Sequence, residues 1–153
     1  MTASRHAPIG WGILGTGNVA GRFASDFSHI KDARLLGVGS RRQDTACRFG
    51  ERFNVSRRYG SYQALVDDSD ITVVYIATPA SFHKDHMIMC LTAGKAVLCE
   101  KPFTLTGDEA EEVIALAGLK HVFLMEAMWT RFLPIMEKLR ELLTKGAIGE
   151  IRH

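Results

Sequence analysis

The stretch GILGTGNVA, residues 12–20, decides how this chain is expected to fold. It completes a short apolar run that begins at Ile9 and leads straight into a helix-like stretch. The spacing G-x-G-x-x-A is typical of the turn between the first strand and first helix of a dinucleotide-binding fold, although glycines after a strand can also form a turn alone. Gly15 is expected to make the tight turn, Gly17 to let the backbone approach a pyrophosphate, and Ala20 to pack closely on the sheet. The predicted phosphate loop comprises Gly15, Thr16, Gly17, Asn18, Val19 and Ala20.

Short apolar runs alternate with helix-like stretches along the rest of the chain. The predicted strands are residues 9–14, 34–39, 71–77, 96–100 and 122–128. The predicted helices are residues 18–30, part of 43–53, 81–94 with Ser81 as N-cap, 106–118 and 133–144. Strands that alternate with helices imply right-handed βαβ crossovers, so the predicted fold class is α/β with a doubly wound, mostly parallel, Rossmann-like sheet. Ligands of such sheets bind at the carboxyl ends of the strands.

Length and composition limit the class of protein. The 153 residues suit one domain, or one domain and the beginning of another. A formal charge of +2 without a long basic run argues against nucleic acid or membrane partners. The first ten residues lack the apolar core of a signal peptide, so the cytoplasm is the expected location. Cys47, Cys90 and Cys99 form no close pair, which indicates neither a disulfide framework nor a zinc site.

The second predicted strand ends in Ser40, Arg41 and Arg42, with no acidic residue at its tip. An acid at this point accepts a hydrogen bond from the adenosine 2′-hydroxyl and favours NAD, whereas an arginine accommodates the 2′-phosphate of NADP. The planar guanidinium of Arg41 suits a phosphate, and Ser40 can donate to it. The sequence therefore favours NADP, with NAD as the second choice. The alternative is a solvated pair of loop arginines.

The predicted strand 71–77 runs directly into Thr78 and Pro79. Pro79 fixes the exit of the chain and offers a flat apolar surface beside a bound ring. His83 and His86 follow on the next helix, three residues apart. Two histidines without further ligands do not make a metal site, so no metal is predicted, and the pair is interpreted as surface or supporting groups.

The predicted strand 96–100 ends on two opposite charges and a proline, Glu100, Lys101 and Pro102. A lysine at the mouth of a parallel sheet can donate to a substrate oxygen or take part in proton transfer. Glu100 can orient that lysine or contact the cofactor. A cis bond between Lys101 and Pro102 is expected to aim the lysine into the crevice. The alternative is a surface Glu–Lys pair at the end of a strand.

Four segments in this order resemble the Gfo/Idh/MocA oxidoreductases. They are GILGTGNVA (12–20), ATPASFHKDH (77–86), GKAVLCEKP (94–102) and EAMWTRFLP (126–134). The resemblance runs from about Ile9 to the end of the chain, and E-K-P is its most specific element. The last two segments are most similar to the branch that contains dimeric dihydrodiol dehydrogenase.

The resemblance implies an N-terminal Rossmann domain followed by a larger α/β domain with an open sheet. On this likeness, residues 1–128 form the dinucleotide-binding domain and residues 129–153 a connecting helix and the start of a truncated second domain. The last residues, GEIRH, stand where the first strand of that domain would begin, so the rest of it is expected to be missing here. The segment from Trp129 onward is then expected to expose apolar surface.

The resemblance also implies roles for single residues. Lys101 is the catalytic lysine, while the second catalytic group and most substrate contacts come from the second domain. Where the family often has Asn or His after the Thr-Pro pair, this chain has Ala80, so one polar contact near the nicotinamide is missing. Besides the phosphate loop and residues 40–42, the implied cofactor-binding residues are Ala77, Thr78, Pro79, His83, Glu100, Lys101, Pro102, Trp129 and Arg131.

The activity implied is that of an NADP-dependent oxidoreductase acting on CH–OH or CH–CH groups. It would move hydride between the nicotinamide and a carbonyl or hydroxyl carbon of a sugar, polyol or diol, in a homo-oligomer when full length. This chain alone is expected to lack the complete active site. The alternative is a non-catalytic NAD(P)-binding module that senses the cofactor or needs a partner chain, although a sensor has no need of Lys101. A methyltransferase is disfavoured because it predicts an acid where Ser40 and Arg41 stand.

Overall fold

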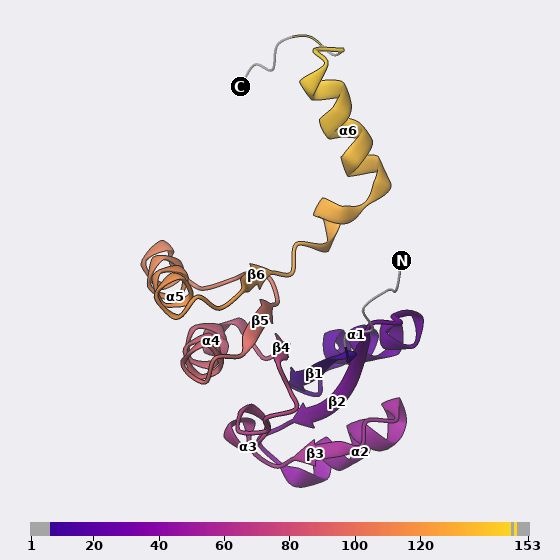
Figure 1. The fold of residues 1–153 in the computed structure, drawn as a ribbon, viewed down its shortest axis with the longest axis vertical. Coiled ribbons are helices and arrows are strands. Elements are labelled where there is room, and N and C mark those ends of the chain that lie inside the picture. Colours follow the sequence, from indigo (N-terminus) through magenta and orange to yellow (C-terminus); the bar gives the residue numbers. More distant parts are fainter. Residues whose placement is uncertain (1–6, 148, 150–153) are drawn as a thin grey trace.

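The strands form one parallel sheet in the computed structural model, which describes residues 7–147 and 149 (Figure 1). The strands are β1 (Ile9–Leu14), β2 (Ala33–Gly39), β3 (Arg57–Tyr59), β4 (Val73–Ile76), β5 (Ala96–Cys99) and β6 (Leu124–Glu126). Within the described residues their order across the sheet is β3-β2-β1-β4-β5-β6. The chain winds outward from β1 in one direction and from β4 in the other, so the predicted doubly wound α/β fold is confirmed.

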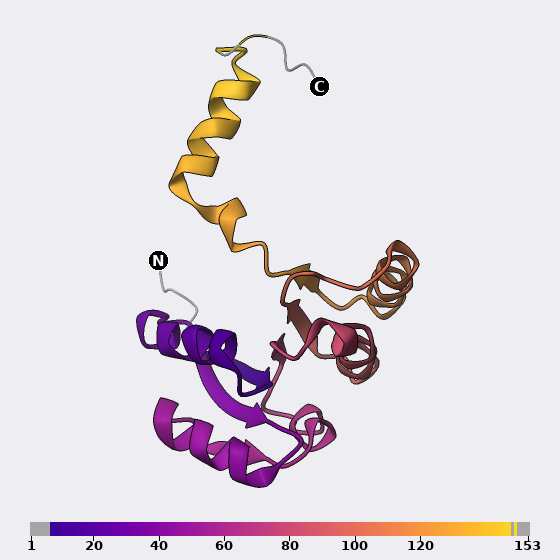
Figure 2. The same cartoon turned by 180° about the vertical axis from the view of Figure 1, so that it is seen from behind.

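Helices cover both faces of this sheet. The helices are α1 (Asn18–Asp26), α2 (Gln43–Phe53), α3 (Tyr62–Val66), α4 (His83–Thr92), α5 (Gly107–Lys120) and α6 (Pro134–Thr144). Short 3₁₀ turns are η1 (Phe27–His29), η2 (Ala80–Phe82) and η3 (Trp129–Phe132). Helices α1 and α2 lie on one face, and α3, α4 and α5 lie on the other, as opposite views show (Figures 1 and 2).

The core is divided by the sheet into two apolar layers, and β4 contributes to both. Val74 and Ile76 belong to the layer beneath α4 and α5, whereas Tyr75 belongs to the layer beneath α1 and α2. Successive strand residues point to opposite faces, which explains this division. The nearly continuous apolar run 71–77 therefore marks a strand covered on both faces, as expected.

Several predicted boundaries are wrong, and two elements were not predicted. β3 and α3 are only three and five residues long, too short to show a hydrophobic period. Ser81 is not a helix cap, because it lies inside η2 and α4 begins after it at His83. The stretch 18–30 divides into α1 and η1. The strands expected at 71–77 and 122–128 are shorter, since β4 and β6 cover only their central residues.

Helix α5 begins as predicted but ends later. The Thr106 side chain accepts from the Glu109 backbone N–H at 3.3 Å, while the Glu109 carboxylate accepts from Leu105 at 2.9 Å. The helix passes Gly118 and continues to Lys120, because His121 takes the left-handed conformation (φ 53°) that ends it. A glycine within a helix therefore did not mark its end.

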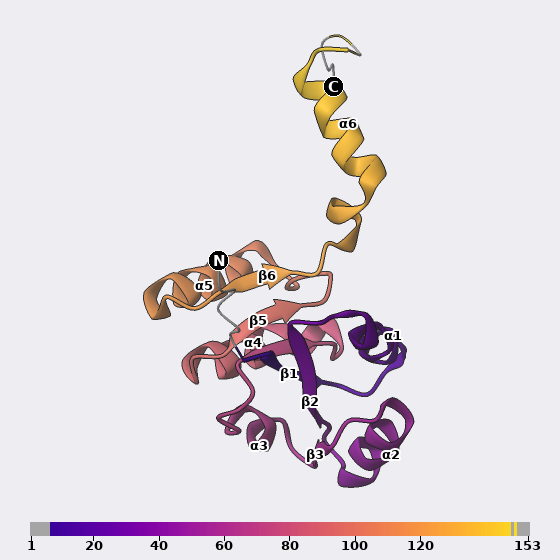
Figure 3. The same ribbon diagram turned by 45° about the vertical axis from the view of Figure 1, so that its right-hand side comes forward.

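The last described segment leaves the sheet. In Figure 3, η3 and α6 extend away from the strands. Trp129, Phe132 and Ile135 are 63%, 58% and 68% exposed, which confirms the expected apolar surface. Residues 150–153, where the second domain was expected to begin, lie outside the described residues. The division at residue 128 stays a prediction.

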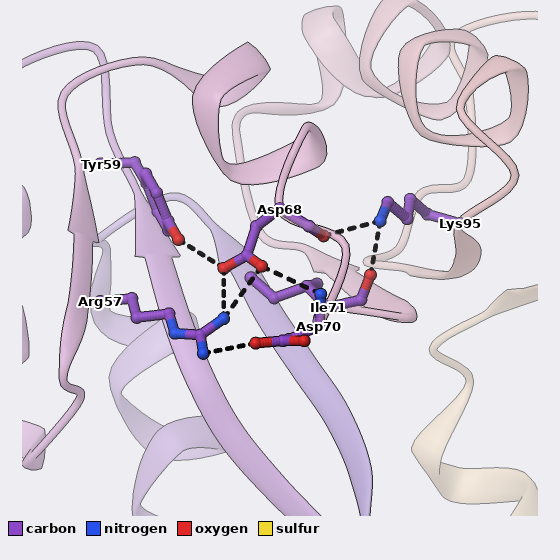
Figure 4. Close-up of polar contacts among 6 residues, drawn as sticks. All are labelled: Arg57, Tyr59, Asp68, Asp70, Ile71 and Lys95. Atoms are coloured by element: carbon purple, nitrogen blue, oxygen red, sulfur yellow. Dashed lines mark hydrogen bonds and ion pairs between the residues drawn. The ribbon is translucent and has the colours of Figure 1, made fainter.

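A polar cluster joins β3 to the segments that precede β4 and β5 (Figure 4). We call it the Arg57 cluster, and its members are Arg57, Tyr59, Asp68, Asp70 and Lys95. Arg57 donates to both carboxylate oxygens of Asp68, at 2.9 and 2.7 Å, and to Asp70 at 2.6 Å. Tyr59 donates to Asp68 at 2.5 Å. Lys95 donates to the carbonyls of residues 68 and 71, both at 2.7 Å.

Candidate functional site

The carboxyl ends of the strands bring the predicted motifs to one edge of the sheet. Backbone hydrogen bonds continue across the sheet just beyond the strand ends, from Gly15 to the Gly39 carbonyl and from Glu100 to the Ile76 carbonyl, each at 2.9 Å. The glycine loop, Ser40, Thr78 and Glu100 therefore follow neighbouring strands at the same edge, as the sequence predicted.

The glycine loop has the shape that a pyrophosphate needs. Gly15 has φ +108°, and a Cβ there would lie 2.7 Å from the Ala77 carbonyl oxygen, so only glycine fits. Around an added Cβ at Gly17, by contrast, no atom of the described residues lies within 4 Å. None of the described side chains caps α1, and its first turn carries no acid, so its free N–H groups suit an anion. Ala20 is fully buried, whereas Asn18 and Val19 are exposed.

The two arginines at the tip of β2 differ in whether their side chains are already bound. Arg42 binds Asp44 through two hydrogen bonds, at 3.0 and 2.9 Å, which raise its pKa and lower the pKa of Asp44. Arg48 approaches the same carboxylate at 3.2 Å. Arg41 is exposed and has no ion pair or hydrogen-bond partner in the described part of the chain. Among the described residues, Arg41 is therefore the cation at this point that is available to a ligand.

Ser40 belongs to a hydroxyl chain that the sequence did not reveal. Its Oγ lies 2.5 Å from Thr45 Oγ1, and Thr45 donates to the Arg42 carbonyl at 2.8 Å. Because the Thr45 proton is used in this way, Ser40 donates to Thr45. A threonine in the first turn of a helix that follows the β2 tip was the available signal for this residue.

A pocket of about 200 Å³ opens beside Arg41. It is lined by Arg41, Tyr62, Pro79, Phe82 and His86. The rings of Tyr62 and Phe82 lie 4.7 and 5.9 Å from the His86 ring, centroid to centroid. Tyr62 and Phe82 were not predicted as site residues, because α3 was not predicted and Phe82 has no polar group to mark it. The pocket can hold a flat ring between apolar and aromatic surfaces.

The two histidines hold the loops of the site in place. His83 is 1% exposed, and its Nδ1 and Nε2 lie 2.9 Å from the carbonyl oxygens of Pro102 and Thr78. His86 Nδ1 lies 2.9 Å from Thr78 Oγ1, and burial lowers the pKa of His86. The predicted contact of His83 with the cofactor is therefore indirect, through the two loops that it joins. Among the described residues, no group of three or more His, Cys, Asp or Glu is placed to hold a metal.

The E-K-P segment, residues 100–102, directly follows β5 at the same edge of the sheet. The Lys101–Pro102 bond is cis, as predicted. The Glu100 carboxylate accepts from the Tyr75 hydroxyl at 2.5 Å and from the Lys101 backbone N–H at 3.2 Å. Burial, and then the bond to Glu100, raise the pKa of Tyr75, so its hydroxyl stays protonated. The Lys101 side chain is exposed and makes no ion pair within the described residues.

The segment after β6 borders a second pocket, of about 240 Å³, on the α1 side of the sheet. Its lining is mostly apolar, and its polar groups are one carboxylate, one hydroxyl and one indole N–H. The lining residues are Phe23, Tyr75, Leu98, Glu100, Met125, Ala127, Met128, Trp129 and Phe132. Trp129 thus lines the same pocket as Glu100, and its contact with the cofactor stays a prediction. Arg131 lies on η3, is exposed, and lines neither of these two pockets.

A doubly wound sheet with a glycine loop at the point where its strand order reverses defines a dinucleotide-binding domain. Residues 9–128 match the family model described as oxidoreductase family, NAD-binding Rossmann fold. The chain therefore belongs to the Gfo/Idh/MocA oxidoreductase family, and it binds NAD(P) through this domain.

Relatives and solved structures agree with this assignment. The chain is 43% identical to trans-1,2-dihydrobenzene-1,2-diol dehydrogenase of Mus musculus and 40% identical to that of Xenopus laevis, over 144 residues that make up 93% of this chain. These residues cover 43% and 44% of the two relatives, so the chain spans less than half of their length. It is 34% identical to KijD10, a 3-ketoreductase from Actinomadura kijaniata solved with NADP (TM-score 0.84; 95% of this chain, 46% of that one). The expected branch is thus confirmed.

No helix among the described residues is long and apolar enough to cross a membrane.

Proposed function

We propose that this chain is the cofactor-binding part of an NADP-dependent oxidoreductase. The enzyme would move hydride between the nicotinamide and a carbonyl or hydroxyl carbon of a sugar, polyol or diol-like substrate. The observation that carries the proposal is the Lys101 side chain, which is exposed, makes no ion pair among the described residues, and lies at the same sheet edge as the glycine loop. The names of the relatives, a diol dehydrogenase and a 3-ketoreductase, support the substrate class.

The dinucleotide is assigned to three groups of residues along the edge. The phosphate loop, residues 15–20, would hold the pyrophosphate on the N–H groups of α1. Arg41 would hold the adenosine 2′-phosphate, with Arg42 as a weaker contributor and the Ser40 hydroxyl turning from Thr45 to donate to the phosphate. The pocket beside Arg41 has the aromatic lining that an adenine ring requires.

The nicotinamide end is assigned to the loops after β4 and β5. The residues concerned are Ala77, Thr78, Glu100, Lys101, Pro102 and Trp129, whereas Pro79, predicted to lie beside the nicotinamide, lines the pocket next to Arg41. When bound, the cofactor supplies or accepts the hydride. Lys101 would donate a hydrogen bond to the substrate oxygen and stabilise the negative charge that develops there as a carbonyl is reduced. A second acid–base group is assigned to residues outside this chain, as is the greater part of the substrate site.

Cofactor binding by this chain tests the first part of the proposal. Titration of NADPH with the 153-residue chain, followed by nicotinamide fluorescence, is expected to saturate. A signal that stays linear in protein concentration would contradict the assignment of the edge. The same chain is expected to show no steady-state turnover with diols or sugars, and sustained turnover would show that the site is complete here.

A binding module that requires a partner chain is the second candidate. The exposed apolar side chains of η3 and α6, including Trp129, Phe132 and Ile135, favour a chain that is covered by something else. The two candidates differ over Lys101. In a sensor, Lys101→Ala would leave the response to the cofactor unchanged, whereas in the enzyme it would abolish reduction of the substrate.

Partners and location complete the proposal. A small-molecule substrate is the principal partner, and a homo-oligomer is proposed for the full-length form, with neither nucleic acid nor membrane as a partner. A cytoplasmic location is proposed because Cys47, Cys90 and Cys99 are all free thiols. Light scattering of the full-length protein and fractionation of its source cells test these points. A monomer, or a secreted protein, would contradict them.

A further inference from the structure

Glu100 and Lys101 carry opposite charges on adjacent residues, yet they do not pair. No ion pair of the described residues includes either of them. Each oxygen of the Glu100 carboxylate accepts one hydrogen bond, one from the Tyr75 hydroxyl at 2.5 Å and the other from the Lys101 backbone N–H at 3.2 Å. The carboxylate is therefore directed toward Tyr75, and the ammonium of Lys101 is left exposed.

Tyr75 is held rigidly enough to impose this direction. It lies in the middle of β4, opposite Ile13 of β1 and Leu98 of β5. It is 2% exposed, and its ring stacks on Phe23 of α1 with centroids 3.8 Å apart and planes at 20°. A ring confined between the sheet and a helix cannot follow Glu100 if that carboxylate moves. The hydroxyl thus acts as a fixed donor at the end of β5.

The other side chains near Glu100 make no hydrogen bond to its carboxylate within the described residues. Glu126 of β6 is an acceptor, and it binds the Phe103 N–H at 2.9 Å. The Cys99 thiol is buried and lies 3.9 Å from the Phe103 carbonyl. Trp129, whose indole N–H is a donor, lines the same pocket as Glu100, but it is 63% exposed and no hydrogen bond joins the two. Without the Tyr75 hydroxyl, the Glu100 carboxylate would lose its side-chain donor, and the neighbouring cation Lys101 would become its strongest partner.

We propose that Tyr75 is a positioning residue that keeps Glu100 away from Lys101, so that the lysine ammonium stays free for the substrate oxygen. The purpose of a free Lys101 rests on the proposed function, whereas the restraint itself rests only on the contacts of Tyr75. The consequence is that the reactivity of Lys101 depends on a residue buried beneath the sheet edge.

The reactivity of Lys101 toward an acylating reagent tests the restraint directly. The 153-residue chain is treated with limiting N-hydroxysuccinimidyl acetate, and acetylation of each lysine is followed by peptide mass spectrometry. An ion pair with Glu100 stabilises the ammonium and slows the reaction, since a unit charge a few ångströms away in a solvated setting contributes about 1 kcal/mol, or about fivefold. Tyr75→Phe is therefore expected to slow acetylation of Lys101 about three- to tenfold, relative to exposed Lys120 in the same sample.

Two further variants show whether the effect passes through Glu100. In the double variant Tyr75→Phe, Glu100→Gln, the rate at Lys101 is expected to return to near the wild-type value, because the carboxylate charge is gone. Tyr59→Phe is the matched control, since it removes another tyrosine hydroxyl that donates to a carboxylate at 2.5 Å, in the Arg57 cluster. This control is expected to leave the rate at Lys101 unchanged.

Several results would overturn the proposal. One is an unchanged rate at Lys101 in a Tyr75→Phe chain with a native circular dichroism spectrum. If that variant does not fold, Glu100→Gln alone decides: a gain in Lys101 reactivity of fivefold or more would mean that Glu100 already pairs with Lys101 in the native chain. The assay contains neither cofactor nor substrate, so its failure is distinct from a failure of NADPH binding, which would instead contradict the proposed function.

Discussion

The carboxyl edge of the sheet and the Arg57 cluster use the same kinds of charged residue in opposite ways. In the Arg57 cluster, Arg57 makes three hydrogen bonds to two carboxylates, and Lys95 donates to two carbonyls. At the carboxyl edge, Arg41 and Lys101 have no partner among the described residues, and both are exposed. Charges that are fully paired hold the chain together, whereas unpaired charges at a strand end are available to a ligand.

The pKa shifts follow the same division. The hydrogen bonds that Arg57 donates to Asp70 and Asp68 raise the pKa of Arg57. Burial by itself would raise the pKa of Asp68, but the hydrogen bonds from Tyr59 and Arg57 outweigh it and bring that pKa below its ordinary value. The Arg57 cluster is thus stabilised in its charged form. The comparison predicts that substitutions at the carboxyl edge change function with little loss of stability. Substitutions in the Arg57 cluster are predicted to lower stability with little change in function.

The largest effect is expected for Lys101→Met. In the complete enzyme, turnover should fall by about 10²–10⁴-fold, because the group that donates to the substrate oxygen is lost. The melting temperature of this chain should stay within about 2 °C of the original, since surface substitutions usually change stability little. Steady-state kinetics and thermal denaturation measure the two effects. Turnover within tenfold of that of the original enzyme would contradict the role proposed for Lys101.

The next effect concerns cofactor choice. Arg41→Ala is expected to raise the Kd for NADPH about 10- to 100-fold, as the loss of a charge-assisted hydrogen bond to a phosphate implies, and to change the Kd for NADH less than threefold. Arg42→Ala is the matched control, and it should have a smaller effect because that guanidinium is bound to Asp44. Fluorescence titration with both cofactors measures the difference. Equal losses for NADPH and NADH would refute the phosphate assignment.

A third substitution examines the Arg57 cluster. Asp68→Ala removes the acceptor for Arg57 and for the Tyr59 hydroxyl, so the melting temperature is expected to fall by about 5 °C. The Kd for NADPH should be unchanged. Asp67→Ala, at an exposed neighbour that accepts only from Gln63, is the control and should have almost no effect. Comparable melting temperatures for the two variants would show that the cluster does not stabilise the fold.

The smallest effect is a pH dependence of the same cluster. Because the pKa of Asp68 is lowered in the folded chain, its contribution to stability is present above its unfolded pKa, about 3.9, and is lost as the pH falls further. The difference in melting temperature between the original chain and Asp68→Asn should therefore be constant near neutral pH and shrink below about pH 4. A difference that grows on acidification would contradict the assigned ionisation.

The parts of the fold that were predicted correctly are those with a clear hydrophobic period. The strand at Ile9–Leu14 agrees with the prediction residue by residue, and the helix predicted within residues 43–53 fills that whole range, since the first is a short apolar run and the second shows a helical period. β3, with the polar sequence RRY, and the five-residue α3 show no such period. Their places are set by pairing with β2 and by packing, which a single sequence does not display.

The residues of the candidate site likewise fall into those that the sequence predicted and those that it did not. Gly15, Arg41 and Lys101 were predicted because each has an unusual residue type at the end of a strand. Thr45 and Tyr75 were missed, since a threonine in a helix and a tyrosine in an apolar strand look ordinary in the sequence. Only the fold shows that their hydroxyl groups reach Ser40 and Glu100.

The sequence by itself determined the order of the strands and helices other than β3 and α3, and the chemistry gathered at the carboxyl edge, because periodicity and residue type are local properties. Only the tertiary structure decided which of those charges are free. Arg41 and Arg42 are neighbours in the sequence, yet Asp44 binds the second and leaves the first exposed. Glu100 and Lys101 are neighbours as well, yet Tyr75, twenty-five residues earlier in the chain, takes the carboxylate. Whether a charge is paired depends on the direction of side chains from different elements, and that direction exists only once the sheet has formed.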